Sequence, residues 1–178
     1  MADKTIDAVA LSANLIRCKS VTPVDDGALD VLQAALKPLG FDCTEITFDE
    51  GGVPVRNLFA RIGDSGPHLC FAGHTDVVPV GDAAAWTVDP FGGEIRDGIL
   101  WGRGATDMKA AIGCFADAAS QILAENSGQP GGSISLLITG DEEGPGINGT
   151  KKVLEWMARN GHTPDAALVG EPTNPQSM

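Results

Sequence analysis

Three short apolar runs in this chain each end on a cluster of histidine or acidic residues. The runs and the clusters that follow them are Leu69–Ala72 before His74–Asp76, Ser133–Thr139 before Asp141–Glu143, and Ala166–Val169 before Glu171. Continuous apolar runs of this length are typical of strands that are buried on both faces of a sheet. Such a sheet must be covered by helices on both faces. The runs therefore predict an α/β protein with three layers and a largely parallel, twisted sheet.

Segments with helical periodicity alternate with these runs, which supports the same fold class. Helices are predicted over Ile6–Ile16, Ala28–Leu39, Met108–Ala124 and Gly149–Arg159, with Gly40 ending the second. The polarity alternates like that of half-buried strands over Thr44–Phe48 and Asn57–Ile62. Residues 77–106 are rich in Gly, Pro and Trp and predict loops, with short strands near Gly93–Ile95 and Ile99–Trp101.

The composition excludes several classes of function. The chain has 178 residues, and its 12 Lys and Arg against 24 Asp and Glu give a net charge of −12. This balance argues against nucleic acid, whose phosphates require a surplus of basic residues. No apolar stretch is long enough for a membrane span, and the polar start argues against export, so we expect a cytoplasmic protein without a membrane partner. The cysteines form no C-x-x-C pair, which suits reduced thiols: Cys18, Cys43, Cys70 and Cys114.

His74 and Asp76 form the first candidate site. On an extended segment, residues i and i+2 point the same way, so the two side chains face together. A histidine that binds a metal commonly donates its second ring N–H to a carboxylate, and Asp76 fits that position. The alternative is a core histidine at a strand end with an acid in the following turn. For the H-x-D tripeptide by itself, that alternative is the favoured interpretation.

The other candidates are acids that follow strands or begin a helix. Asp107 stands at a helix start, where Asp is usually an N-cap. The acids Asp141–Glu143 repel one another and resist desolvation unless a cation or hydrogen-bond donors compensate them, although for this motif by itself an exposed acidic loop is at least as favoured. Glu171 repeats the pattern of a strand followed by an acid. Because the carboxyl ends of parallel strands bind ligands in open α/β sheets, we expect these side chains to meet in one crevice.

Considered together, these residues favour a metal centre. His74, Asp107, Glu143 and Glu171 form a hard, oxygen-rich set that suits Zn, Co or Mn better than copper or an iron–sulfur cluster. One tetrahedral zinc needs fewer carboxylates than this set offers. Two metal ions about 3.5–4 Å apart, sharing a bridging carboxylate, account for the number.

A close resemblance to a known family runs through nearly the whole chain. The segments that carry it are HTDVVPVGD, WTVDPF, LWGRGATDMK, ITGDEEGPGINGTKKVLEWM and LVGEPTN. They resemble the co-catalytic zinc amidohydrolases and peptidases, which include aminoacylases, acetylornithine deacetylases and carboxypeptidase G-like enzymes. Within that family they are most similar to the branch that removes succinate from N-succinyl-LL-2,6-diaminopimelate in bacterial lysine biosynthesis. The resemblance implies a metal-dependent amide hydrolase acting on a small N-acyl diamino acid. Acetylornithine or another N-acyl amino acid is the alternative substrate.

The resemblance also implies the metal ligands. His74 binds one zinc ion, and Glu171 completes the same or the neighbouring site. Asp107 bridges two Zn²⁺ ions, for which Co²⁺ is a possible substitute, and Glu143 is a further ligand.

The same resemblance assigns the proton chemistry. Glu142 is the general acid and base, which takes a proton from water and hands it to the leaving amine, and Asp76 orients His74. The Asp107–Met108 peptide bond is expected to be cis. Ala110 stands where the family usually has Gly, which we expect to require only a small adjustment in the helix.

The resemblance further implies that residues 1–178 are the N-terminal portion of a catalytic domain. In the family, the chain continues from the G-E-P-T segment into a lid domain that forms the dimer, and then returns with a final His ligand. This chain stops at Met178, and its other histidines, His68 and His162, are expected to be surface or structural residues. We therefore expect little activity from these residues alone and a homodimer through the lid in the full-length protein. The alternative of another class is a non-catalytic binding module whose metal residues are idle.

Overall fold

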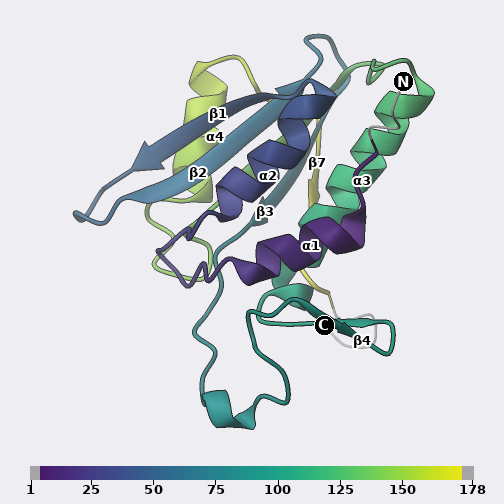
Figure 1. Ribbon diagram of the computed structural model, residues 1–178. Coiled ribbons are helices and arrows are strands. Elements are labelled where there is room, and N and C mark those ends of the chain that lie inside the picture. The colour runs from purple at the N-terminus through teal and green to yellow at the C-terminus, as the bar shows by residue number, and fades with distance from the viewer. Residues whose placement is uncertain (1–4, 174–178) are drawn as a thin grey trace.

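A five-stranded sheet forms the middle layer of the protein, as seen in a computed structural model that describes residues 5–173 (Figure 1). The strand order is β1-β2-β6-β3-β7. The strands are β1 (Asp42–Phe48), β2 (Val55–Ile62), β3 (His68–His74), β6 (Ser133–Thr139) and β7 (Ala166–Val169). The three apolar runs are the parallel strands β6, β3 and β7, whereas β1 and β2 add an antiparallel edge. The sheet is therefore mixed, because the short connection between β1 and β2 leaves no length for a crossover.

Helices cover both faces of the sheet, which confirms the predicted three-layer α/β fold. On one face lie α1 (Ala8–Arg17), α2 (Ala28–Leu36) and α3 (Ala110–Glu125), and on the other lies α4 (Thr150–Arg159) (Figure 1). The α-helix α2 ends at Leu36, three residues before the predicted end, and continues as a 3-10 turn over Lys37–Leu39. Gly40, with φ +99°, ends this helical segment as predicted. None of the described helices is long and apolar enough to cross a membrane.

Residues 77–106 form a loop that extends from the body of the protein, as their composition predicts (Figure 1). The loop contains a 3-10 turn (η2, Ala83–Ala85) and a small two-stranded sheet of β4 (Glu94–Arg96) and β5 (Ile99–Trp101). It leads into the turn η3 (Ala105–Lys109), which delivers Asp107 and enters α3.

The described residues form two hydrophobic cores, one on each face of the sheet, and the strands contribute side chains to both. Along β6, Leu136 and Ile138 pack toward α1, α2 and α3, while Leu137 packs toward α4 with Val153 and Met157. Alternation follows from the period of two in a strand. Each fully buried apolar side chain of this size contributes about 1.5–3 kcal/mol. The outer parallel strand β7 is instead exposed along its length, contrary to the burial that its apolar run predicts.

The turn before α3 lies close beneath the ends of two strands. The Asp107–Met108 peptide bond is cis, as expected, and both residues have non-helical backbone angles, so α3 begins at Ala110 rather than at Met108. The Met108 side chain is fully buried, and a Cβ atom placed on Gly73 or on Gly170 would lie 2.5 Å from its terminal methyl carbon. Glycine at both positions therefore lets β3 and β7 approach the turn that carries Asp107.

The two histidines outside the candidate site have structural roles. His68 is buried, and its Nε2 lies 2.7 Å from Ser135 Oγ, so of the two predicted alternatives it is a structural rather than a surface residue. His162 stacks on Trp156 and contacts Arg61 through Nδ1 at 3.1 Å. Local sequence patterns predict neither the Ser135 nor the Arg61 contact, because both partners come from distant parts of the chain.

Candidate metal centre

Four elements bring the candidate residues to one edge of the sheet. His74 is the last residue of β3, Glu142 and Glu143 lie in the loop after β6, and Glu171 follows β7. Asp107 reaches the same place from the turn η3. Because β3, β6 and β7 are parallel, their carboxyl ends share an edge, which is why the predicted convergence occurs.

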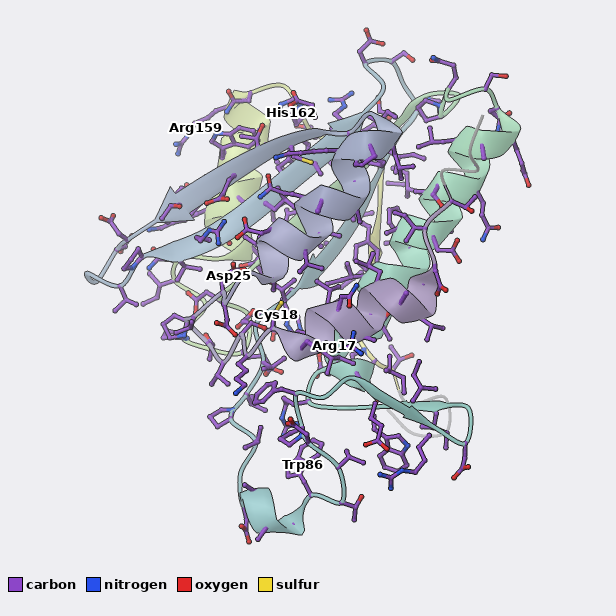
Figure 2. The ribbon with its side chains drawn as sticks, viewed as in Figure 1. Arg17, Cys18, Asp25, Trp86, Arg159 and His162 are labelled. Carbon is purple, nitrogen blue, oxygen red and sulfur yellow. The ribbon has the colours of Figure 1, made fainter. Side chains whose placement is uncertain are left out.

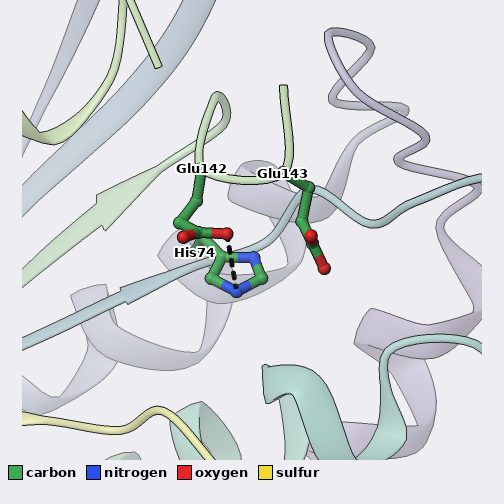
Figure 3. Close-up of side chains that lie close together, drawn as sticks. All are labelled: His74, Glu142 and Glu143. Carbon is green, nitrogen blue, oxygen red and sulfur yellow. Dashed lines mark ion pairs between the residues drawn. The ribbon is translucent and has the colours of Figure 1, made fainter. Parts of the chain in front are cut away.

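His74 Nε2 is the centre of this cluster. It lies 3.1 Å from Asp107 Oδ1, 3.6 Å from Glu171 Oε1 and 3.8 Å from Glu142 Oε2. The ligand atoms of His74, Glu142 and Glu143 lie within 4.8 Å of one another, as do those of His74, Asp107 and Glu171. Figure 3 shows Glu142 and Glu143 extending from one loop, with the Glu142 carboxylate over the imidazole ring. All the predicted ligands are thus brought together.

The hydrogen bond at the other ring nitrogen of His74 defines its tautomer. His74 Nδ1 lies 2.8 Å from the backbone carbonyl oxygen of Asp76. A carbonyl oxygen can only accept, so Nδ1 carries the hydrogen in the neutral ring and Nε2 presents a lone pair. That lone pair faces three carboxylates, which are also acceptors. Only a cation or an added proton makes this arrangement favourable.

Asp76 contacts the site differently from what the sequence predicts. We expected its carboxylate to accept the hydrogen of His74, but Asp76 Oδ1 is 3.6 Å from Nδ1, and the carbonyl takes the bond instead. The carboxylate accepts the backbone N–H groups of Glu142 at 3.1 Å and Glu143 at 3.0 Å. Asp76 therefore fixes the loop that presents both glutamates. The difference arises from backbone rotation after β3, which residue spacing does not determine.

Replacing Asp76 with Ala is expected to destabilise the fold by about 1–3 kcal/mol, because two backbone N–H groups lose their acceptor in a partly buried loop. The free energy of unfolding, measured by urea titration, tests this. Asp76→Asn keeps one acceptor oxygen and is expected to lose less. Equal stability of the Ala variant and the parent would contradict the structural role of this carboxylate.

The cluster carries more negative charge than its own residues balance. Burial raises the pKa of Glu143 and of Glu171, and the neighbouring Asp107 carboxylate raises both further. Burial also acts to lower the pKa of His74, but the Asp76 carbonyl and the carboxylates outweigh it, so the net pKa is raised. A bound divalent cation would compensate the charge of these carboxylates and so favour their ionised form.

The geometry fits a zinc ion held through His74. Two ligand atoms bound at about 2.0–2.2 Å to a tetrahedral zinc lie roughly 3.3–3.6 Å apart. The separations from His74 Nε2 to Asp107 Oδ1 and Glu171 Oε1, 3.1 and 3.6 Å, are close to that range. One imidazole nitrogen binds one ion. Among the described residues, a second ion would therefore be held by carboxylates alone.

Sequence reasoning missed the residues that hold the acidic loop in place. Asp141 is buried, and its carboxylate accepts the backbone N–H groups of Gly146 at 3.2 Å and Asn148 at 2.8 Å. The Asn148 carbonyl in turn accepts from the Asn57 side chain on β2 at 3.0 Å. An Asp followed by a Gly-Pro-Gly turn is a signal for such a loop, whereas the reach to β2 requires the fold.

Curated relatives are very similar to this chain. A succinyl-diaminopimelate desuccinylase of Rhodospirillum centenum is 63% identical over 173 residues, which cover 97% of this chain and 45% of the relative. A protein of the same name from Gluconacetobacter diazotrophicus is 59% identical, over 96% of this chain and 44% of the relative. The chain therefore spans a little under half of the length of these relatives.

Solved structures show the same fold at lower identity. Human carnosine dipeptidase 1 superposes with a TM-score of 0.76 at 22% identity, over 94% of this chain and 38% of that structure. An M20 family metallo-carboxypeptidase from Sulfolobus solfataricus also gives 0.76, at 20% identity, over 92% of this chain and 37% of that structure. The sequence profile of peptidase family M20/M25/M40 matches residues 70–178. The chain belongs to peptidase family M20/M25/M40, a family of metal-dependent hydrolases.

Proposed function

We propose that this chain is the N-terminal portion of the catalytic domain of a cytoplasmic zinc hydrolase that removes succinate from N-succinyl-LL-2,6-diaminopimelate. The observation that carries the proposal is the lone pair of His74 Nε2 facing three carboxylates at 3.1–3.8 Å. The 63% identity to a succinyl-diaminopimelate desuccinylase over nearly the whole chain supports this choice of substrate. This identity also supports a place for the reaction in lysine and diaminopimelate biosynthesis.

His74, Asp107, Glu143 and Glu171 are the proposed ligands of two zinc ions. Their chemistry supports this role, because imidazole nitrogen and carboxylate oxygen are ligands that zinc prefers. Asp107 is the proposed bridge, since it belongs to the group of His74 and Glu171 and its carboxylate also raises the pKa of Glu143. When bound, zinc polarises an amide carbonyl and makes water more acidic.

Glu142 is the proposed general acid and base. Its side chain is 46% exposed, in contrast to the fully buried His74 ring, so the carboxylate is accessible to water and substrate. Water attacks the amide carbon as Glu142 accepts its proton. The C–N bond then breaks as Glu142 returns that proton to the amine, releasing succinate and diaminopimelate. Asp76 holds the Glu142 backbone N–H and thereby supports the orientation of this carboxylate.

The rest of the proposed enzyme lies in the part of the relatives that this chain does not cover. The chain spans 45% of the Rhodospirillum relative, which leaves length for a lid domain and a final ligand. We propose that the full-length protein is a homodimer through that lid.

The test compares two polypeptides, residues 1–178 and a full-length protein that contains them. With zinc supplied, the full-length protein is expected to hydrolyse N-succinyl-diaminopimelate in preference to N-acetylornithine, and residues 1–178 are expected to show little turnover. Preference for N-acetylornithine would support the deacetylase alternative. Full activity from residues 1–178 would show that the lid is not required. Absence of bound metal after zinc supplementation, measured by elemental analysis, would support a non-catalytic module and overturn the proposed function.

A further inference from the structure

Lys109 is a charged side chain that the proposed chemistry does not use, although it lies two residues after Asp107. It is fully buried. Its Nζ donates to the carbonyl oxygens of Leu15 at 2.9 Å and Cys18 at 3.0 Å, and to Ser20 Oγ at 2.8 Å. The three donors of the ammonium group are thus all satisfied. Two of the acceptors lie at the carboxyl end of α1, where Cys18 follows the helix (Figure 2), and where the helix dipole favours a positive charge.

The third partner connects Lys109 to the metal centre. Ser20 Oγ donates to the backbone carbonyl of Thr75 at 2.6 Å. Thr75 is the residue between His74, which presents the central nitrogen, and Asp76, whose carboxylate holds the loop of Glu142 and Glu143. A hydroxyl group that accepts from an ammonium group is polarised and donates more strongly, so the two bonds reinforce each other.

The segment around Ser20 runs beside the segment that follows His74. The Ser20 carbonyl accepts from the Val77 backbone N–H at 2.9 Å, and Thr22 N–H donates to the Val77 carbonyl at 3.1 Å. Residues 20–22 are therefore hydrogen-bonded to residues 75–77. Lys109 connects residues 20–22 to the turn that carries Asp107, because its Nζ donates to Ser20 Oγ while its backbone N–H donates to the Gly104 carbonyl at 2.9 Å.

We propose that Lys109 is a positioning residue of the metal centre. Through Ser20 and Thr75 it sets the separation between His74 and Asp107, which come from different elements and whose ligand atoms lie 3.1 Å apart. It contacts neither the metal nor the substrate. The inference rests on the proposed function, because it assigns to Lys109 the task of holding two proposed ligands at the spacing that zinc requires.

The test is zinc binding by residues 1–178, measured by calorimetry, together with the visible absorption of bound Co²⁺. Lys109→Met keeps the length of the side chain but removes its donors. It is expected to weaken zinc binding by about 10–100-fold, as loss of a group supporting a ligand typically does, and to alter the cobalt spectrum. Leu123→Ala is the matched control, because it truncates a buried side chain near the far end of α3. It is expected to lower the Tm but to leave zinc affinity and the cobalt spectrum unchanged.

Ser20→Ala separates the connection from the folding role, because it keeps Lys109 and its two carbonyl partners. It is expected to weaken zinc binding in the same direction, and it carries the test if Lys109→Met does not fold. The double variant is expected to bind zinc about as strongly as Lys109→Met alone, because both changes break one connection. Parent-like zinc affinity in Lys109→Met or in Ser20→Ala, or losses that multiply in the double variant, would overturn the inference. If the parent chain itself binds no zinc, the proposed metal centre fails, and the inference fails with it.

Discussion

Replacing Glu142 with Gln is expected to lower kcat for N-succinyl-diaminopimelate by about 10²–10⁴-fold while zinc affinity stays close to that of the parent. Gln has the size of Glu but cannot accept a proton at the amide, so the change removes proton transfer and little else. The position of the carboxylate supports this result, since Glu142 Oε2 lies 3.8 Å from His74 Nε2 and the side chain is 46% exposed. Steady-state kinetics and zinc calorimetry on the same preparation give both quantities.

Glu143→Gln is the matched comparison, because both glutamates come from one loop and both reach the cluster. Because Glu143 is a proposed ligand, its replacement is expected to lower zinc affinity as well as kcat. The measurements use whichever polypeptide, residues 1–178 or the full-length protein, hydrolyses the substrate when it carries the parent sequence. A Glu142→Gln enzyme as active as the parent would contradict the proton-transfer role. Loss of zinc in this variant with normal affinity in Glu143→Gln would exchange the two assignments.

Replacing His74 with Ala is expected to weaken zinc binding by at least about 100-fold, more than the 10–100-fold typical of a supporting residue. His74 belongs to both groups of metal-ligating side chains, and its ring is fully buried at their centre. Its removal leaves only carboxylates, whose mutual repulsion opposes a compact site. Calorimetry with zinc, and metal content after gel filtration, measure the loss.

His162→Ala is the control for this experiment. His162 lies outside the metal-ligating groups and packs on Phe59 and Trp156, so its replacement is expected to lower stability while zinc affinity remains within about twofold of the parent. If His74→Ala binds zinc as tightly as the parent, the metal centre lies elsewhere.

Much of the fold and of the candidate site could be predicted from the sequence because local signals carried the information. The apolar runs at Leu69–Ala72 and Ser133–Thr139 became β3 and β6, and the acids that follow them met at one edge because parallel strands share their carboxyl ends. The antiparallel edge was not predicted, since the alternation of polar and apolar residues identifies a strand but does not define which strand it pairs with. The direction of β1 and β2 follows from the length of their connection, and their place beside β6 follows from packing.

The contacts within the site were harder to predict. H-x-D spacing placed His74 and Asp76 together, but backbone rotation decided that the Asp76 carbonyl, rather than its carboxylate, would meet Nδ1. Lys109 lies in a D-M-K segment at the start of a helix, where a lysine is ordinarily solvated. Its acceptors at Leu15 and Ser20 lie about ninety positions earlier in the chain.

The sequence by itself determined which residues bear the chemistry and to which edge of the sheet they come. Those properties depend on the period of a strand and on the residue types at its end, which are local. Only the tertiary structure decided which atoms face which, how the loop of Glu142 and Glu143 is held, and why Lys109 can be charged and buried. Those properties depend on distances of about 3 Å between segments far apart in the chain, and such distances are fixed by packing and hydrogen bonding of the whole domain.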